Sequence, residues 1–240
     1  MTDFIRAFWK RRSKIFKRAA IGAACYVLLR IVSAGGPLSG MPFSRAVYDA
    51  DGKLLRLTIS TDQKYRKFTS LTDMSPAVSE AFLLREDKYF YFHPGVNPAA
   101  LLKATRGYFS GGSARGASTI TMQLARMKYG LETRSIRGKI FQILCAFYLE
   151  FRYSKSSILE AYLNLIPLGH NIEGVPAASL IYFGKASSSL NPVEAITLCI
   201  IPPSPAKRTR NSSNTAIEID QFRKQLFEQL PARPGAIVFL

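Results

Sequence analysis

Residues 135–153 read SIRGKIFQILCAFYLEFRY, and this stretch decides the class of fold. Apolar residues recur along it every three or four positions, which is the period of one face of an α-helix. The spacing therefore predicts a helix over the whole stretch. A second strip has the same spacing but is mostly polar, and such a strip either faces water or lines a cleft. The apolar strip is Ile136, Ile140, Leu144, Phe147 and Phe151, and the polar strip is Lys139, Gln142, Ala146 and Glu150.

Helix signals continue on both sides of this stretch. Ser75-Pro76, Asn97-Pro98 and Asn191-Pro192 each place a capping residue before a proline, which is typical of a helix start. The last of these helices should end at the proline pair 202–203. The expected helices are 75–86, 97–109, 118–129, 154–166 and 191–201.

The start of the folded body carries a strand signal. Short strands are expected at 46–48 and 54–57, because Asp51-Gly52 between them is a typical hairpin turn. The chain is therefore predicted to be mainly α, with a small N-terminal β hairpin. The expected organisation is a basic segment at 1–18, an apolar segment at 19–38, a folded body at 46–207 and a C-terminal tail at 208–240.

The composition excludes several classes of protein. Of the 240 residues, 48% are hydrophobic and 20% charged, so the chain is not intrinsically disordered. It holds 33 Lys or Arg against 16 acidic residues, a net charge of +17. Such a balance calls for an anionic partner: nucleic acid, lipid headgroups or a phosphorylated substrate. Three scattered cysteines and two histidines argue against a disulfide framework and a zinc site.

The N-terminal residues have the pattern of a membrane anchor. A basic stretch precedes an apolar one, which predicts a cytoplasmic N-terminus, a single-pass transmembrane helix at 19–38 and a body on the outer side. Arg30 interrupts the span and would have to reach the headgroups. Two other interpretations stay open: a signal peptide cleaved near Ser33-Ala34-Gly35, and a soluble amphipathic helix.

Two segments of the body carry candidate chemistry. Glu86-Asp87 closes a predicted helix, and a partly buried carboxylate there can act as a general base, although acids at a helix end are more often solvated. Gly116 to Arg126 is a Gly-rich loop that runs into a helix, where free N–H groups and hydroxyls can bind an anion. It is not a Walker loop, and an ordinary capped helix has the same pattern.

Five stretches taken together resemble glycosyltransferase family 51, the peptidoglycan polymerases. Each is weak alone, but their order and spacing are specific, and they span about residues 46–207. The stretches are EDKYFYFHPG (86–95), GASTITMQLAR (116–126), RGKIFQILCAFYLE (137–150), ILEAYLN (158–164) and AASLIYFGK (177–185).

The resemblance implies a fold and a reaction. The fold would be a lysozyme-like helical domain with a membrane-facing lobe, at the periplasmic face of the bacterial inner membrane. The reaction would join lipid II units into β-1,4 glycan strands, with inversion and release of undecaprenyl pyrophosphate. Its partners would be lipid II, the lipid-linked glycan strand and the membrane, and no nucleic acid.

The resemblance also implies roles for single residues. Glu86 would be the general base, and Gln142 occupies the position of a second catalytic glutamate. Glu160, Tyr162 and Asn164 match a motif that braces the cleft. The expected substrate-binding residues are Asp87, His93, Ser118, Thr119, Gln123, Arg126, Arg134 and Lys139.

The sequence departs from the family in three ways. Gln142 cannot titrate or offer a negative charge, which weakens the case for a divalent cation such as magnesium, although it can still hydrogen-bond a substrate oxygen. Arg126 replaces a common lysine and keeps the charge. No transpeptidase motif is present, so the chain is expected to be monofunctional, with a separate transpeptidase as partner, or a fragment.

Three other functions remain to be weighed against this one. A lysozyme-like glycan hydrolase would share a helical body with one essential glutamate, but it has no need for clustered cations. An inactive scaffold that binds lipid II would follow if Gln142 had removed the activity. A nucleic-acid binder is the weakest alternative, because the basic residues do not follow a recognition helix with interleaved aromatics.

Overall fold

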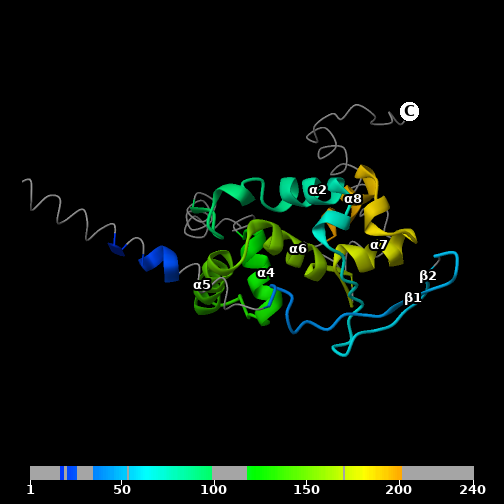
Figure 1. The fold of residues 1–240 in the computed structure, drawn as a ribbon, viewed down its shortest axis with the longest axis horizontal. Coiled ribbons are helices and arrows are strands. Elements are labelled where there is room, and N and C mark those ends of the chain that lie inside the picture. The colour runs from blue at the N-terminus through cyan, green and yellow to red at the C-terminus, as the bar shows by residue number, and fades with distance from the viewer. Residues whose placement is uncertain are drawn as a thin grey trace, which may run out of the picture.

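The computed structural model describes residues 17–18, 21–25, 35–52, 54–98, 118–169 and 171–201. These residues are mainly helical with a small N-terminal hairpin, as predicted (Figure 1). The α-helices are α2 (Pro76–Glu86), α4 (Ile120–Tyr129), α5 (Ile136–Arg152), α6 (Lys155–Leu165), α7 (Val175–Phe183) and α8 (Pro192–Ile200). The 3-10 helices are η1 (Leu71–Asp73), η2 (Phe90–Phe92) and η3 (Ser187–Ser189), and the strands are β1 (Ala46–Tyr48), β2 (Leu54–Leu57), β3 (Pro167–Gly169) and β4 (Ile172–Glu173).

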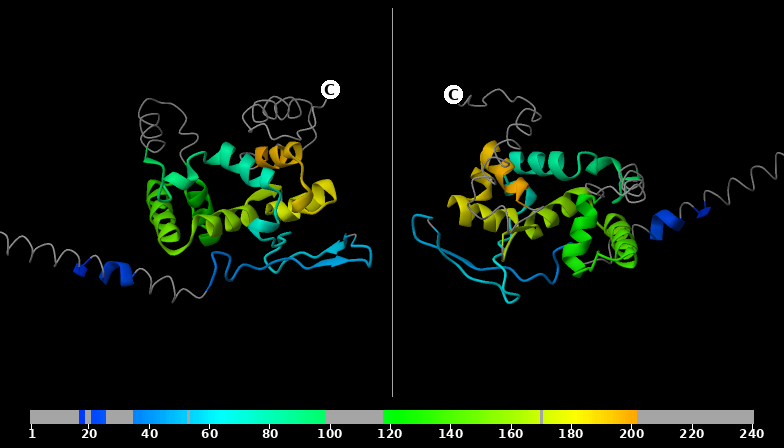
Figure 2. Two further views of the ribbon diagram at one scale, coloured as in Figure 1. Left: turned by 45° about the horizontal axis from the view of Figure 1, so that its top comes forward. Right: turned by 180° about the vertical axis from the view of Figure 1, so that it is seen from behind.

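Helix α6 lies at the centre of the core. Both Ile158 and Leu159, and every residue from Ala161 to Leu165, are buried, so the helix is covered on almost all sides. Helices α4 and α7 pack on it, and α2 packs on α8 (Figures 1 and 2). A helix that is apolar nearly all round belongs inside a protein, and burying its side chains drives the assembly of the others.

Helix α5 confirms the predicted helix but not the usual burial of its apolar strip. The apolar strip faces outward, and its five side chains are between 44% and 74% exposed. The buried residues are Gln142, Ala146 and Leu149, so the mostly polar strip is the one that packs on the protein. Figure 2 shows α5 at the end of the molecule opposite the β1–β2 hairpin.

The two hairpins differ in how they are held. Strands β1 and β2 pair antiparallel at the predicted positions, with Ala46 opposite Leu57, and the ribbon projects from the helical body (Figure 1). Strands β3 and β4 were not predicted from the sequence. They form beside the bridge between Tyr65 and Ile172, so a contact distant in sequence helps to position them.

The helix caps agree with the sequence in part. Asn191 and Glu194 form the expected reciprocal capping box at the start of α8. Ser75 precedes α2 as predicted, but its hydroxyl makes no capping bond, and its N–H donates to the Ser187 carbonyl at 3.0 Å. Helix α7 was not predicted. It begins after Gly174, where a Cβ would collide with the Asn164 carbonyl.

Several predictions fall wholly or partly outside the described residues. These are most of the anchor at 19–38, nearly all of the helix at 97–109, residues 116 and 117 of the Gly-rich loop, and the tail at 208–240. Among the residues that are described, no helix combines the length and the apolar character needed to cross a bilayer.

Candidate active site

Glu86 is the last residue of α2, and its side chain is only 15% exposed. Its Oε2 atom accepts a hydrogen bond from Nε2 of Gln123 at 2.9 Å, and Nε of Arg85 lies 3.9 Å from Oε1. Gln123 belongs to α4, so the first and second family stretches meet at this carboxylate. The sequence predicted both residues as part of the site, and the structure brings them together.

Asp87 organises the backbone around Glu86. Its carboxylate is buried and accepts hydrogen bonds from Nε2 of His93 at 2.9 Å and from the Ile120 N–H at 3.0 Å. The second bond satisfies a free N–H at the start of α4, where a negative charge is also favourable to the helix dipole. This geometry makes Asp87 and His93 internal supports of the site. Their predicted contact with substrate stays a prediction.

The first turn of α4 is held by Thr119. The Thr119 hydroxyl accepts from the Met122 N–H at 3.1 Å and donates to the Gly95 carbonyl at 2.5 Å. Gly95 has a φ of +89° and packs so closely on α5 that a Cβ would lie 2.8 Å from Cγ of Glu150. Thr119 therefore joins the start of α4 to the loop that follows Glu86.

Cations gather beside the same turn. Nζ of Lys139, on α5, donates to Oγ of Ser118 at 2.8 Å. Partial burial lowers the pKa of Lys139, and the positive charge of Arg126 lowers it further. Arg126 lies one turn beyond Gln123 on α4, so the two side chains share a face. Two cations held close together favour the binding of an anion between them.

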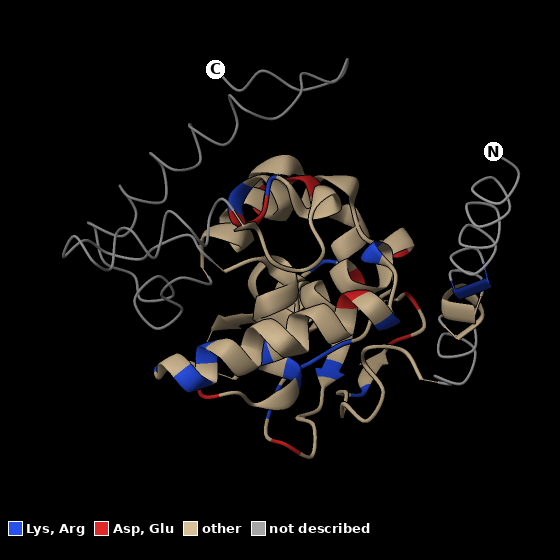
Figure 3. Ribbon diagram, turned by 90° about the vertical axis from the view of Figure 1, so that its left-hand side faces the viewer, with Lys and Arg blue, Asp and Glu red and all other residues tan. Residues whose placement is uncertain are grey.

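Arg134 lies exposed just before α5. Figure 3 views the molecule from the α5 side, and Lys and Arg appear at several points along the helices there. The predicted contact of Arg134 with substrate stays a prediction.

Gln142, which was predicted to be catalytic, lies buried between α5 and α4. Its side chain is 2% exposed, and its Nε2 donates to the Met122 carbonyl at 2.7 Å. Val96, Met122 and Ala146 form the small apolar cluster around it. Oε1 of Gln142 is buried without a partner among the described residues. The amide thus ties α5 to α4, and whether it also acts in catalysis stays untested.

The described carboxylates do not assemble into a metal site. No group of three or more His, Cys, Asp or Glu side chains is placed to hold an ion in the described part of the chain. Magnesium takes oxygen ligands. Asp87, the acid next to Glu86, already accepts two N–H groups, and Gln142 offers a neutral amide oxygen where a carboxylate would offer a charge. We therefore derive no step through a cation.

Two residues that sequence reasoning missed complete the support of the site. Oε1 of Glu150 accepts from the Thr121 hydroxyl at 2.6 Å and from Nζ of Lys155 at 2.7 Å. Lys155 also donates to the His93 carbonyl at 2.7 Å and lies 4.4 Å from the centre of the Phe90 ring. No sequence signal pairs Thr121 or Lys155 with Glu150.

The motif residues Glu160 and Asn164 brace the chain away from Glu86. Glu160 accepts from the Leu71 N–H at 2.8 Å, and Asn164 bonds both the N–H and the carbonyl of Thr69. They therefore secure the segment that leads into α2. Tyr162, between them in sequence, is fully buried and packs against Phe82 of α2.

Comparison with known proteins identifies the family. The family model described as Transglycosylase matches residues 51–229. The chain belongs to the transglycosylase family. The match includes all five stretches named above and continues into the predicted tail.

Curated relatives are similar over the same region. The chain is 37% identical to penicillin-binding protein 1C of Escherichia coli over 172 residues, which cover 71% of this chain and 22% of that protein. It is 37% identical to penicillin-binding protein 1A of Aquifex aeolicus over 167 residues, 69% of this chain and 23% of that one. The chain thus spans about a quarter of these relatives. The stretches TMQLAR (121–126) and NIEG (171–174) favour a 1C-type protein in particular.

A solved structure is also similar. Penicillin-binding protein 1A from Haemophilus influenzae aligns with a TM-score of 0.36 at 19% identity, covering 79% of this chain and 18% of that one.

Proposed function

We propose that the chain is a peptidoglycan glycosyltransferase that polymerises lipid II into β-1,4 glycan strands. The observation that supports this most strongly is that two neighbouring side chains of α4 reach the expected base and the expected anion site. Gln123 donates a hydrogen bond to the Glu86 carboxylate, and the charge of Arg126, one turn further along α4, lowers the pKa of Lys139. Helix α4 therefore lies between the proton acceptor, Glu86 at the end of α2, and the cation Lys139 of α5, and it contacts the first through Gln123. Membership of the transglycosylase family supports the same reaction.

The reaction follows from this arrangement. Glu86 takes the proton of the 4-hydroxyl on the acceptor sugar while that oxygen bonds to the anomeric carbon of the donor. The bond from this carbon to the lipid pyrophosphate breaks on the opposite face, so the configuration inverts. Electrons leave on the pyrophosphate, and Arg126, Lys139 and Arg134 stabilise the charge as it develops.

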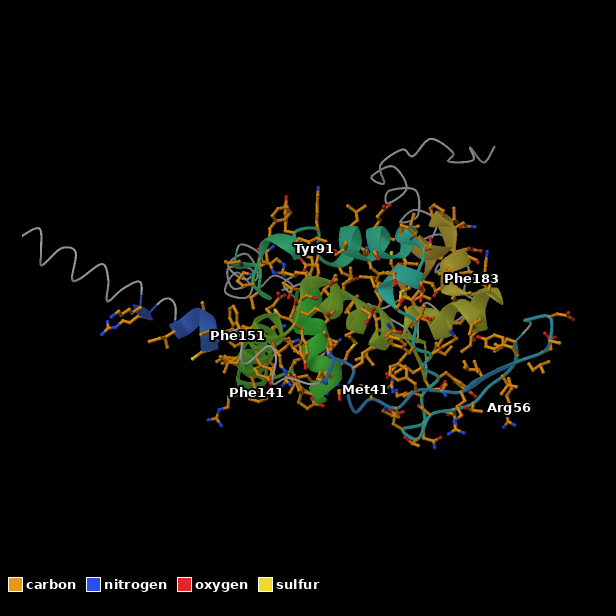
Figure 4. The ribbon with its side chains drawn as sticks, in the orientation of Figure 1. Met41, Arg56, Tyr91, Phe141, Phe151 and Phe183 are labelled. Atoms are coloured by element: carbon orange, nitrogen blue, oxygen red, sulfur yellow. The ribbon has the colours of Figure 1, made fainter. Side chains whose placement is uncertain are left out.

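Helix α5 links this chemistry to a membrane. Its outward face exposes apolar side chains, and the labelled rings of Phe141 and Phe151 lie on it (Figure 4). A large exposed apolar patch is typical of a membrane or protein contact. Lys139 lies on the inner side of the same helix, next to Ser118. We propose that the exposed apolar face of α5 contacts the lipid and that its inner face, through Lys139, binds the pyrophosphate.

The family and the basic-then-apolar N-terminal sequence favour a location at the periplasmic surface of the bacterial inner membrane. The segment 19–38 would anchor the chain, and a separate transpeptidase would cross-link the product. The exposed α5 face supports contact with the bilayer even where the anchor itself is not described.

Polymerisation of labelled lipid II by the full chain in detergent tests the proposal. Because Glu86 is the base, Glu86→Gln should lower the rate by about 100-fold or more with little effect on thermal unfolding. Glu132→Gln, which changes an exposed carboxylate, is the control and should keep activity. Moenomycin, a phosphoglycolipid, should inhibit the wild-type chain.

Other outcomes would assign a different function. Wild-type polymerisation by Glu86→Gln would reject the role of Glu86. Cleavage of finished glycan would indicate a hydrolase. Binding of lipid II without turnover by the unaltered chain would indicate a scaffold.

A further inference from the structure

Tyr162 presents a buried hydroxyl that the fold does not use. The residue lies in the middle of α6, is fully buried, and packs edge-on against Phe82 with ring centroids 6.2 Å apart. Its hydroxyl has no hydrogen-bond partner within the described residues. An unsatisfied buried hydroxyl destabilises a protein, and phenylalanine would fill the same space without that cost. The hydroxyl therefore calls for a role beyond packing.

The contact with Phe82 brings the ring of Tyr162 against α2, the helix that ends at Glu86. Phe82 and Glu86 are four residues apart on α2, so their side chains lie on one face of the helix, one turn apart. Helix α4, which carries Gln123, packs on α6 from another side. Tyr162 is thus enclosed by the two helices whose side chains meet at the Glu86 carboxylate.

The charges around Tyr162 keep it protonated. Burial raises its pKa well above the usual value, and the carboxylate of Glu86 is the strongest charge acting in the same direction. Asp87 adds to the rise, and Arg126 of α4 opposes it. The nearby thiol of Cys199 on α8 carries no charge at neutral pH, because burial raises its pKa to about 12. The phenol is therefore a hydrogen-bond donor at every working pH.

Of the two neighbouring carboxylates, Glu86 is the one that can accept a further hydrogen bond from the Tyr162 hydroxyl. Asp87 already accepts from His93 and from the Ile120 N–H. Glu86 accepts its hydrogen bond from Gln123, a residue that the family resemblance assigns to substrate binding. If the Gln123 amide turns to the substrate, Glu86 loses that donor at the moment when it must be ionised.

Building on the proposed function, we propose that Tyr162 is a positioning residue for Glu86. Its hydroxyl donates to the Glu86 carboxylate when Gln123 engages the substrate, and so holds the base ionised and aimed at the acceptor hydroxyl. Tyr162 keeps its own proton throughout, and the proton of the acceptor sugar goes to Glu86.

The test compares Tyr162→Phe with the wild-type full chain in lipid II polymerisation between pH 5 and 9. A donor to a carboxylate favours its charged form, so losing the donor lets Glu86 hold a proton to higher pH. We expect kcat to fall about 10-fold, as for a hydrogen bond to a charged group, with KM for lipid II little changed. The acidic half-point of kcat/KM should move to higher pH, while thermal stability is kept or improved.

A matched control is Tyr182→Phe, which removes a hydroxyl that donates to the Leu168 carbonyl at 2.7 Å. It should leave the acidic half-point in place. Incorporation of 3-fluorotyrosine at position 162 strengthens the donor at almost constant volume and should move the half-point to lower pH, so the test survives if Tyr162→Phe fails to fold.

The outcomes separate the two proposals. If the wild-type chain polymerises lipid II and neither change at 162 moves the acidic half-point, Tyr162 is only a core residue and the inference is wrong. If the wild-type chain does not polymerise lipid II, the proposed function fails first.

Discussion

Helices α5 and α6 follow each other in the chain but have opposite surroundings. Helix α6 buries Ile158, Leu159 and the whole run from Ala161 to Leu165. Helix α5 exposes its apolar strip and buries Gln142 with Ala146 and Leu149. The first is a core helix. The second has the polarity of a helix that meets protein on its polar side and an apolar medium on the other.

The difference shows how the molecule divides its tasks. Helix α6 supports the site: Glu160 and Asn164 secure the segment before α2, and Tyr162 packs against Phe82 of α2, one turn before Glu86. Helix α5 contributes Lys139 to the site from one face, and the apolar side chains on its opposite face are exposed. Stability should therefore depend on α6, and the handling of a lipid-linked substrate on α5.

The largest expected effect is on the core helix. Leu163→Ala should lower the free energy of unfolding by about 2–5 kcal/mol, because it leaves a cavity in a fully buried position. The matched change on α5, Leu144→Ala, should cost under about 0.5 kcal/mol, because Leu144 is 58% exposed. Urea unfolding in a fixed detergent measures both. Equal losses would contradict the contrast between the helices.

A smaller effect is expected from a charge at the buried face of α5. Gln142→Glu should destabilise by about 1–3 kcal/mol at pH 8, since a carboxylate cannot donate to the Met122 carbonyl. Burial keeps the introduced carboxyl protonated to higher pH in the folded than in the unfolded state. Stability should therefore fall as the pH rises from 5 to 8.

The control for this change is Gln142→Met, which removes the amide without adding a titrating group. Its loss of stability should not depend on pH. If Gln142→Glu were equally stable at pH 5 and pH 8, the side chain would not be buried against α4 as described.

The smallest effect on stability is expected at the outer face of α5. Ile140→Ser combined with Leu144→Ser should change the free energy of unfolding by less than about 0.5 kcal/mol. In vesicles that contain lipid II the same variant should lose activity by about 10-fold, since less apolar area enters the bilayer. Leu55→Ser on the β hairpin, another exposed leucine, is the control. Equal loss in vesicles and in detergent would contradict a membrane contact.

Local signals predicted most of the described helices and the first hairpin. A cap such as Asn191 with Glu194 acts within one turn, so its effect is visible in the sequence. Helix α7 was not predicted, because it is apolar on nearly every side and therefore lacks the alternation of apolar and polar faces that marks a helix in a sequence. Strands β3 and β4 escaped because the bridge from Tyr65 to Ile172 comes from a distant segment.

The site divides in the same way. Glu86, Gln123 and Lys139 were recognisable by residue type and motif. The partners of Glu150 were not, because Thr121 and Lys155 reach it only once α4, α5 and α6 have packed. Likewise, the sequence did not show that Asp87 pairs with His93 and the Ile120 N–H, and their predicted contact with substrate stays a prediction.

The amino-acid sequence by itself determined that the chain is helical, strongly basic and a member of a transglycosylase-like family, because period, charge and motif order are properties of the chain alone. It could not determine which strip of α5 is buried, since both strips repeat with the same period. Only the tertiary structure decided that, by packing Gln142 against α4 and leaving the apolar strip outside. Tertiary packing also decided that the hydroxyl of Tyr162 is buried without a hydrogen-bond partner among the described residues.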